Sequence, residues 1–521
     1  PSPPIMRDSS RSDRDDPACG FVHNDGAMAT PIPENRCIFT LGEIADATGG
    51  LLEANLDKVV RGVSIDTRTI SRGALFVPLK GAGRDGHDFL DAALRAGAGA
   101  AIVEHGRKAA GIDCIEVEDT LAALGSLARA HLRRIRSRTA MPVIAVGGAA
   151  GKTTTKEITA AVARAIFGAA LSTPGNLNNL IGVPMTIFTI AEEHRAAVIE
   201  CGTNTRGEIP RLAAIVEPDV AMVLNVDIEH SEGLGTLEEI ADEEAAIFAT
   251  TRRFAVVPAD EPMSASMLAR RVPKNRRAIT FGESEKADVR LIERSMTAGG
   301  RARIAIEIDA ALVNAEPIRI ESEIALIGRA AALNCTAALA ANFAAASAFG
   351  VKIDQPRIQG VERALASVEA VTGRLAILQS GKIFIIDDTY NANPRSVRAA
   401  LEAAREIATS RNARLVVAMG DMLELGAISA AAHDEALSDI ESAHPAAVIV
   451  VGPEMTAAVK RRAASDIATH RFVTAPDSVE AAKALRDLLR PGDVFLIKGS
   501  RGIAMERILE AIESPQRAIQ C

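Results

Sequence analysis

A strand-to-helix segment built from small residues has the clearest chemical signal in the chain. Residues Val143 to Glu157 read VIAVGGAAGKTTTKE, which is an apolar strand, a Gly/Ala loop and the start of a helix. Small residues let backbone N–H groups curl around phosphate oxygens, Lys152 adds a positive charge, and Thr153 offers a hydroxyl to Mg²⁺. The segment therefore predicts an ATP site. The residues expected to contact the nucleotide here are Gly148, Ala149, Ala150, Gly151, Lys152, Thr153 and Thr154.

The loop is the shorter G-x-x-G-K-T form, because Val146 stands where the eight-residue P-loop has its first glycine. A Gly-rich surface turn with an exposed lysine is the alternative interpretation. The apolar residues that follow repeat at helical spacing, so the loop opens a helix whose dipole also favours anions.

Two more polar side chains follow apolar strands of the same region. Glu200 ends the strand AAVIE, and His230 follows the strand DVAMVLNV. Open α/β sheets bind ligands at the carboxyl ends of their strands, so Glu200 is a candidate Mg²⁺ ligand and His230 a second one. The alternatives are a solvated loop glutamate and a structural histidine.

Polar clusters also end three strands near the C-terminus. They read DDTYNANP from Asp387, GDMLELG from Gly420 and KGSR from Lys498. An ordinary turn seldom needs such a density of carboxylates and amides. We expect these clusters to line one edge of a sheet and to face a ligand.

Composition bounds the class of protein. The 521 residues are 48% hydrophobic and 24% charged, with a net charge of -8, which predicts a soluble globular protein and argues against a nucleic-acid partner. Six scattered cysteines form no C-x-x-C pair, which fits neither a zinc site nor a disulfide framework and indicates a reducing cytoplasm. Apolar stretches such as Ala337 to Ala346 are too short to span a bilayer, so we expect no membrane insertion.

The order of elements predicts an α/β protein of three domains. Residues 1–38 are expected to form a disordered tail, since they are rich in Pro, Ser, Asp and Arg. Residues 39–139 form a compact α/β module. Residues 140–371 form a central P-loop-type domain with a doubly wound, mainly parallel sheet, and residues 372–521 a Rossmann-like domain.

These motifs, taken together, resemble the Mur ligases. The runs that carry the resemblance are GKTTTKE, NLNNLIGVP, IECGTNTRGEI, DDTYNANPRS, MGDMLELG and IKGSRG, together with SIDTR, GALFVPLKG and DGHDF nearer the start. The resemblance covers about Phe39 to Glu510. DDTYNANP with GDMLELG is more specific than the phosphate loop.

The resemblance implies ATP-dependent amide formation through an acyl phosphate, with Mg²⁺ as cofactor. The implied substrates are ATP, a UDP-N-acetylmuramoyl-tripeptide for residues 39–139, and D-alanyl-D-alanine for the C-terminal domain. It assigns catalysis to Lys152, Glu200, His230 and Arg374, ATP contacts also to Asn334, Arg374 and Asp388, and the metal to Thr153, Glu200, His230 and Glu244. Substrate contacts are expected from Ser64, Asp66, Arg68, Lys80, Asn178, Asn179, Tyr390, Asn391 and Asn393.

Two positions depart from the family pattern. Glu244 stands where many Mur ligases carry a carbamylated lysine, and a glutamate keeps the negative charge; the alternative is a solvated acidic face shared with Glu243. Ala330 and Ala331 replace the His-Asn pair used near adenine, while Asn334 is kept.

Three hypotheses follow. The first is a cytoplasmic, monomeric cell-wall precursor ligase acting on small molecules, without nucleic-acid partners. The second is a sister ligase that adds another amino acid or dipeptide. The third, motivated by Ala330 and Ala331, is a binding protein of the same fold that has lost catalysis.

Overall fold

The computed structural model describes residues 30–81, 83–227, 234–297, 300–313, 316–464 and 472–512, and the backbone of 516–517. The chain divides into two compact units, Pro1–Leu127 and Ala128–Cys521. Most of the predicted tail lies outside the described residues. Asn35, however, belongs to the first unit, since its side chain bonds both the N–H and the carbonyl of Val63, each at 2.9 Å.

The first unit contains a five-stranded sheet and a two-stranded one. The larger sheet has the order β2-β7-β6-β5-β4, and β1 pairs with β3 in the smaller sheet. The strands are β1 (Ile38–Thr40), β2 (Leu51–Leu52), β3 (Val59–Arg61), β4 (Val63–Ser64), β5 (Leu75–Phe76), β6 (Ala100–Glu104) and β7 (Asp113–Val117), and the helices are α1 (Leu41–Thr48), η1 (Gly86–Phe89) and α2 (Leu90–Ala96). Helix α3 (Thr120–Arg138) contains the division between the units.

A nine-stranded sheet forms the first half of the second unit, in the order β16-β15-β14-β13-β12-β11-β8-β10-β9. Pairs from β9 to β14 are parallel, and β14, β15 and β16 are antiparallel. The strands are β8 (Val143–Gly147), β9 (Ala170–Ser172), β10 (Ala196–Glu200), β11 (Val220–Val223), β12 (Phe254–Pro258), β13 (Arg277–Gly282), β14 (Val289–Met296), β15 (Ala302–Ile308) and β16 (Ile318–Ile324).

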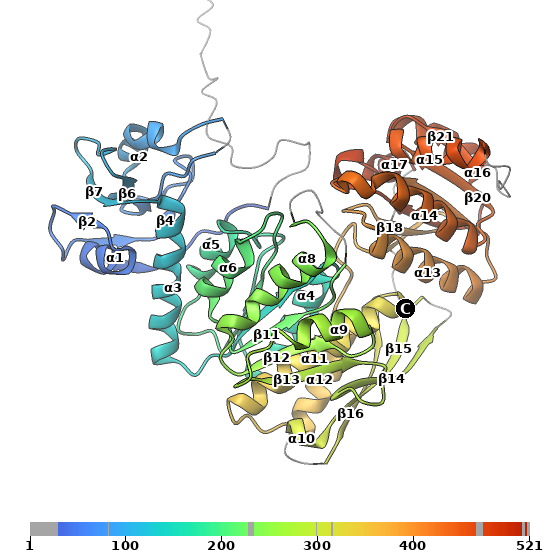
Figure 1. Ribbon diagram of the computed structural model, residues 1–521, viewed down its shortest axis with the longest axis horizontal. Helices are drawn as coiled ribbons and strands as arrows, with labels where there is room; N and C mark the ends of the chain where they lie inside the picture. The colour runs from blue at the N-terminus through green and yellow to red at the C-terminus, as the bar shows by residue number, and fades with distance from the viewer. Residues whose placement is uncertain are drawn as a thin grey trace, which may run out of the picture. The chain divides into compact units, whose positions relative to one another are not determined.

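Helices α4 (Lys152–Phe167), α11 (Gly328–Ala348) and α12 (Gln355–Ser367) pack with this sheet into one apolar core (Figure 1). The other helical segments here are α5 (Gly182–Ile187), α6 (Glu208–Val216), α8 (Leu237–Ala245), η2 (Ala246–Thr250), α9 (Pro262–Ala269) and α10 (Ala310–Val313). At 21 residues, α11 is longer than the apolar run expected from sequence and long enough to cross a membrane, but 78% of its most apolar window is buried. Its alanines pack closely against α4, as in a core helix.

A seven-stranded sheet forms the remainder, in the order β21-β20-β19-β22-β18-β17-β23. One face packs on α13, α14 and α15, and the other on α16 and α17. The strands are β17 (Ala376–Ser380), β18 (Ile383–Asp388), β19 (Leu415–Gly420), β20 (Ala447–Val451), β21 (Phe472–Ala475), β22 (Val494–Lys498) and β23 (Gln516–Arg517), and the helices are α13 (Pro394–Ser410), η3 (Gly426–Ile428), α14 (Ser429–Ser442), α15 (Pro453–Ala464), α16 (Ser478–Leu488), η4 (Arg501–Ile503) and α17 (Glu506–Ala511). Strands β18 to β22 of this sheet are parallel, and β17 is antiparallel.

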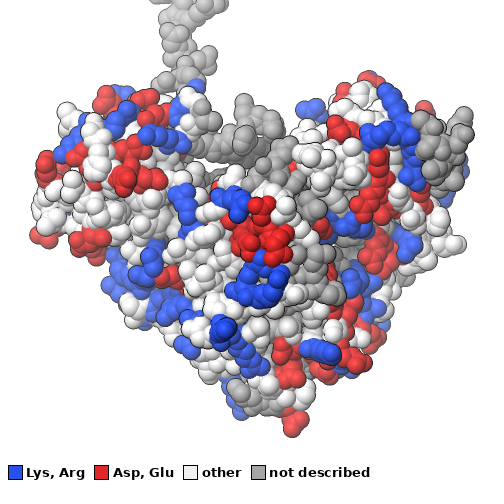
Figure 2. Space-filling model, viewed as in Figure 1, with Lys and Arg blue, Asp and Glu red and all other residues white. Residues whose placement is uncertain are grey.

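The predicted fold class is confirmed: the protein is α/β, with mostly parallel sheets in the second unit. Charged side chains of both signs are interspersed over the face shown in Figure 2, rather than collected into one basic stripe.

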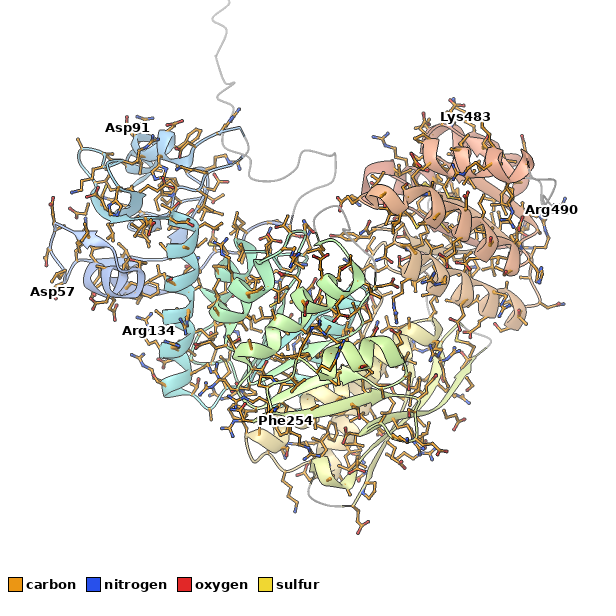
Figure 3. The ribbon with its side chains drawn as sticks, viewed as in Figure 1. Asp57, Asp91, Arg134, Phe254, Lys483 and Arg490 are labelled. Carbon is orange, nitrogen blue, oxygen red and sulfur yellow. The ribbon has the colours of Figure 1, made fainter. Side chains whose placement is uncertain are left out.

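The C-terminal part of helix α3, which belongs to the second unit, is bound within that unit by a set of polar contacts. Arg136 reaches the Asp219 carboxylate at 2.7 Å and the Glu217 carbonyl at 2.8 Å. His131 donates from Nε2 to the Ile190 carbonyl at 2.8 Å, and its Nδ1 accepts from Arg134, 3.3 Å away. The Arg134 side chain is labelled in Figure 3. Burial lowers the pKa of His131 to about 4, so the ring is neutral at physiological pH.

The Glu217 carboxylate gives a testable contribution to stability. Burial disfavours its charge, but hydrogen bonds from Arg133 and Arg129 lower its pKa from 4.5 to about 2. A lowered pKa in the folded state stabilises the protein above about pH 4.5, and this stability is lost as the pH falls toward 2. Glu217→Gln should cost about 1–2 kcal/mol at pH 7, after allowance for solvent screening, and roughly 1 kcal/mol less at pH 4.

Urea unfolding of both proteins at the two pH values measures this difference. Glu192→Gln is the matched control, because Glu192 pairs with Arg138 at the surface with both side chains more than half exposed; its effect should stay within about 0.5 kcal/mol. A Glu217→Gln effect that is equal at pH 7 and pH 4 contradicts the assignment.

Candidate functional site

The loop between β8 and α4 turns so tightly that glycine is required at two positions. Gly148 has a φ of 120° and Gly151 a φ of 87°, both in the left-handed region. A Cβ atom on Gly148 would lie 2.8 Å from the N–H of Leu224, and one on Gly151 would lie 3.0 Å from Asn334 Oδ1. The neighbouring strand end and α11 therefore press directly on the loop.

Two side chains from neighbouring elements hold this loop by its backbone. The Gly148 N–H donates to Glu244 Oε2 at 2.7 Å. The Asn225 side chain accepts from the Ala150 N–H at 2.8 Å and donates to the Ala150 carbonyl at 2.9 Å, while the Asn225 carbonyl accepts from the Ala149 N–H at 3.1 Å. The first three loop residues thus have their N–H groups engaged with protein acceptors.

The N–H groups of Gly148, Ala149 and Ala150 are bound to Glu244 and Asn225, and the start of α4 follows them, where a helix has donors without intrahelical acceptors. The Lys152 ammonium lies over the same loop, 2.6 Å from the Gly148 carbonyl and 3.4 Å from the Ala149 carbonyl. The start of α4 therefore has the chemistry that suits an anion.

Glu200 lies at the C-terminal end of β10, beside the start of α4. Its carboxylate is buried, and Oε1 accepts from the Thr153 hydroxyl at 3.1 Å and from Asn178 Nδ2 at 2.8 Å. Oε2 is also buried and has no hydrogen-bond donor in the described part of the chain. A hydroxyl and a carboxylate with an unsatisfied oxygen, next to a phosphate loop, form a donor set that suits Mg²⁺, which takes few protein ligands and completes its shell with phosphate and water.

Glu244 is 1% exposed, and Glu243 is 7% exposed, so the solvated acidic face considered from sequence is wrong. Glu243 accepts from the N–H groups of Gly207 and Ile209, at 2.9 and 2.8 Å, and so caps α6. Burial is the main cause that raises the pKa of the Cys201 thiol, and the nearby carboxylates of Glu200 and Glu244 raise it further. Glu244 thus brings a second negative charge to the base of the phosphate loop.

The N-terminus of α11 lies beside the same loop. The Asn334 amide packs against Gly151. Ala330 is exposed and Ala331 is buried, and neither supplies a polar side chain. Arg329 is bound to Glu283 by a two-point ion pair at 2.6 and 3.0 Å. Asn334 is therefore the polar side chain that this helix brings to the loop.

Strands β18 and β22 place Asp388 and Lys498 side by side at one edge of the seven-stranded sheet. Lys498 Nζ donates to Asp388 Oδ2 at 2.6 Å and to the Asn391 carbonyl at 2.9 Å, and Lys498 is 1% exposed. The other oxygen, Asp388 Oδ1, accepts from the Leu375 N–H at 3.1 Å. Asp388, expected from sequence to reach ATP, is held here by an ion pair that the sequence analysis missed.

Arg374 lies over the ring of Tyr390, with its guanidinium carbon 4.1 Å from the ring centre, and Arg501 lies 5.9 Å from the same centre. The Nε atom of Arg374 is buried and has no acceptor among the described residues. A buried, unsatisfied guanidinium nitrogen beside Tyr390 suits an anionic ligand. Asn393 instead caps α13 through Ser396, so its amide is used locally.

The remaining polar loop of this edge is held by His433. The Met422 N–H donates to His433 Nε2 at 3.0 Å, so the ring carries its proton on Nδ1, which faces the Ser429 carbonyl at 2.7 Å. Asp421 caps α15 by accepting from the N–H groups of Glu454 and Met455. The Leu423 N–H donates to Ser500 Oγ at 2.9 Å and the Ser500 N–H donates to the Asp421 carbonyl at 3.0 Å, which places the GDMLELG loop beside the KGSR loop.

The four substrate residues expected in the first unit lie in two loops. Ser64 Oγ donates to the Asp66 carbonyl at 3.0 Å, and Asp66 accepts from the Arg68 backbone and side chain, each at 2.9 Å. Burial opposes the charge of Asp66, but the Arg68 contacts lower its pKa overall. Lys80 pairs with Glu104. Ser64, the last residue of β4, thus forms one folded turn with Asp66 and Arg68, while Lys80 follows β5.

His230 lies outside the described residues. Sequence reasoning missed Asn225, which holds the phosphate loop, and Lys156, which is completely buried near Glu200. Asn225 is the polar residue that ends DVAMVLN, a signal of the same kind that pointed to Glu200. Lys156 had a weaker signal, since a charged residue in the first turns of a helix is usually exposed.

Three segments of the chain match one family. Residues 59–132 match the Mur ligase family catalytic domain, residues 146–342 the Mur ligase middle domain, and residues 373–501 the Mur ligase glutamate ligase domain. Together these segments cover more than half of the chain. The chain belongs to the Mur ligase family.

Its similarity is strong to one kind of ligase within that family. The UDP-N-acetylmuramoyl-tripeptide–D-alanyl-D-alanine ligases of Treponema pallidum and Escherichia coli K12 are each 32% identical to it, over 86% and 91% of this chain and 92% and 98% of the relative. MurF from Acinetobacter baumannii superimposes with a TM-score of 0.80 at 29% identity, over 92% of this chain and all of that one. A MurF ligase from Thermotoga maritima in complex with ADP gives 0.73 at 28% identity, over 87% and 96%.

Removing the loop lysine should separate catalysis from folding. Lys152 contacts carbonyls of its own loop and is partly exposed, so Lys152→Ala should lower ATP-dependent turnover by about 100-fold or more, because the charge that stabilises the transferring phosphoryl group is lost. The melting temperature should change little. A coupled ADP-release assay and thermal unfolding measure both quantities, with Lys352→Ala, at an exposed position, as the control. Wild-type turnover in Lys152→Ala would remove this residue from the site.

Proposed function

We propose that this chain is a cell-wall precursor ligase that adds D-alanyl-D-alanine to UDP-N-acetylmuramoyl-tripeptide at the expense of ATP. The observation that carries the proposal is the length of the similarity: ligases of this name match 86–91% of the chain at about 30% identity. The phosphate loop and the polar edge of the C-terminal sheet both lie within the matched segments.

The reaction that follows has two steps. A carboxylate is a poor electrophile, so an oxygen of the tripeptide's terminal carboxylate first attacks the γ-phosphorus of ATP, which forms an acyl phosphate and releases ADP. The amine of D-alanyl-D-alanine then attacks the acyl carbon, the carbon–oxygen bond to phosphate breaks, phosphate leaves, and the amine loses a proton. Positioning and charge neutralisation are the protein's main contributions.

In the second unit, we assign the positively charged residues to the nucleotide and one carboxylate to the sheet edge beside it. Lys152 and the first turn of α4 hold the triphosphate, and Arg374, with its buried unsatisfied nitrogen, supplies a second cation to the nucleotide. The Asp388 carboxylate, held by Lys498, is the anionic group on the same sheet edge. We assign Lys152, Glu200, His230 and Arg374 to catalysis.

Thr153, Glu200, His230 and Glu244 are proposed to hold Mg²⁺, which would neutralise phosphate charge when bound. The unsatisfied Glu200 Oε2 supports this assignment for Glu200. Asn334, packed on Gly151, supports a base or ribose contact from α11. Ala330 and Ala331 leave adenine recognition to Asn334 and to backbone groups.

The proposed substrate contacts are of two kinds. Arg68, Lys80, Tyr390 and Asn391 bring side chains to partly or fully exposed positions, as direct recognition requires. The amide groups of the other three residues are used in hydrogen bonds within the protein: Asn178 binds Glu200, Asn179 binds the start of α5, and Asn393 binds the start of α13. These residues would act by shaping the loops that contact the substrate. We further propose that the protein is a monomer and works in the cytoplasm. We propose no membrane insertion, since the apolar helix α11 is a core element.

The choice of acceptor separates this proposal from its competitors. With ATP, Mg²⁺ and UDP-N-acetylmuramoyl-tripeptide, the purified chain should release ADP with D-alanyl-D-alanine at least about 100-fold faster than with single amino acids, because a site built for a dipeptide's polar groups loses them with a shorter acceptor. A coupled ADP-release assay with mass detection of the product measures this preference. Faster turnover with another acceptor identifies a sister ligase. No turnover with any acceptor favours a binding protein.

Glu244 can be tested through charge and length separately. Glu244→Gln keeps an oxygen that can accept from the Gly148 N–H but removes the charge, whereas Glu244→Asp keeps the charge and draws back the acceptor. If Glu244 acts on the metal, Gln should raise the Mg²⁺ concentration needed for half-maximal rate by roughly 10-fold or more, and by more than Asp does. If Asp is the more harmful change, Glu244 serves only to hold the loop.

A further inference from the structure

Lys156 is a fully buried lysine that no role described so far uses. It lies on α4, one turn beyond Lys152 and Thr153, and it is 0% exposed. Its ammonium donates to the Thr173 carbonyl at 2.8 Å and to the Gly175 carbonyl at 3.1 Å, and it lies 2.8 Å from the Glu157 carboxylate. A buried charge is costly unless partners compensate it, so a lysine at this place calls for an explanation.

The two carbonyls that Lys156 binds belong to the segment that leads from β9 to the polar loop at 176–179. The same stretch, residues 173–178, also binds Glu200 by hydrogen bonds. The Thr173 hydroxyl accepts from the Glu200 N–H at 2.9 Å, and Asn178 donates to Glu200 Oε1 at 2.8 Å. Thr173 itself is completely buried. Lys156 therefore binds a segment, residues 173–178, that contacts both the backbone and the side chain of Glu200.

The charge of Lys156 also faces Glu200 directly. Its Nζ lies 3.8 Å from Glu200 Oε2, within ion-pair range but beyond hydrogen-bond range. Oε2 is the buried oxygen without a donor in the described part of the chain. The ammonium thus attracts this carboxylate electrostatically without using the lone pairs of Oε2, which stay available to another ligand.

We propose that Lys156 is a positioning residue for the metal side of the reaction. It ties the 173–175 segment to the phosphate-loop helix, and through Thr173 and Asn178 it holds the Glu200 carboxylate beside Thr153. The proposal rests on the function proposed above, because it requires that Glu200 acts on a nucleotide-bound cation. It adds a residue that links the helix, the loop and the carboxylate into one unit.

A direct binding measurement tests this role. Calorimetric titration of ADP into the full chain, with and without Mg²⁺, gives the factor by which Mg²⁺ tightens ADP binding. In Lys156→Met this factor should fall by about 10-fold, as for other residues that orient metal ligands, while binding of ADP without Mg²⁺ stays within about twofold of wild type. A lysine that only fills space would leave the Mg²⁺ factor unchanged, and that result overturns the proposal.

Two further variants keep the test decisive. Lys460→Met makes the same change at an exposed position of α15 and should match wild type in both titrations. Thr173→Val keeps the carbonyl bound by Lys156 but removes the hydroxyl that accepts from the Glu200 N–H, and it should lower the Mg²⁺ factor in the same direction. If Lys156→Met does not fold, an unchanged factor in Thr173→Val overturns the proposal by itself.

The activity assay separates this inference from the proposed function. In Lys156→Met, kcat should fall and the Mg²⁺ requirement rise, while KM for the dipeptide acceptor stays within about twofold of wild type. The titrations need no acceptor. Suppose that Lys156→Met reduces the Mg²⁺ factor but the wild-type protein makes no product with D-alanyl-D-alanine. This result would support the positioning role of Lys156 and reject the assigned acceptor.

Discussion

The organisation of the second unit depends on how the backbone of the phosphate loop is held. A loop with two residues at positive φ requires glycine at both, and its N–H groups need acceptors when it is buried. Asn225 at the end of β11 and Glu244 on α8 supply those acceptors from two neighbouring elements. The strand end and the helix thus fix the loop before any ligand arrives, which is the preorganisation that phosphoryl transfer requires.

The same principle recurs along the carboxyl edges of both sheets. Glu200 is oriented by Thr153 and Asn178, and Asp388 is oriented by Lys498 and the Leu375 N–H. Each carboxylate is buried, and each takes its partners from other segments of the chain. Buried polar groups that are satisfied in this way hold a single geometry, because any other orientation would leave a charge unpaired in a low dielectric.

Much of the site was predictable because the placement of its residues follows from chain direction. In a parallel sheet, every strand delivers its carboxyl end to the same edge, so Glu200 and the clusters at Asp387, Gly420 and Lys498 could be assigned to the carboxyl edges of their sheets from strand patterns alone. The α/β class followed from the alternation of strands and helices for the same reason. The solvated interpretation of Glu243 and Glu244 failed, because an acidic helix segment has the same pattern whether it faces solvent or caps a neighbouring helix and holds a loop.

What the sequence determined by itself was local: the glycines that permit the phosphate loop, the helix that follows it, the strand ends that bear carboxylates, and the motifs that resemble the Mur ligases. Tertiary structure alone decided which groups are paired. Asn225, Lys156 and Lys498 lie 75, 17 and 110 positions in the chain from the residues they bind. No local pattern encodes such a pairing, since it arises only when the sheets bring distant strand ends within hydrogen-bond distance and burial makes each contact obligatory.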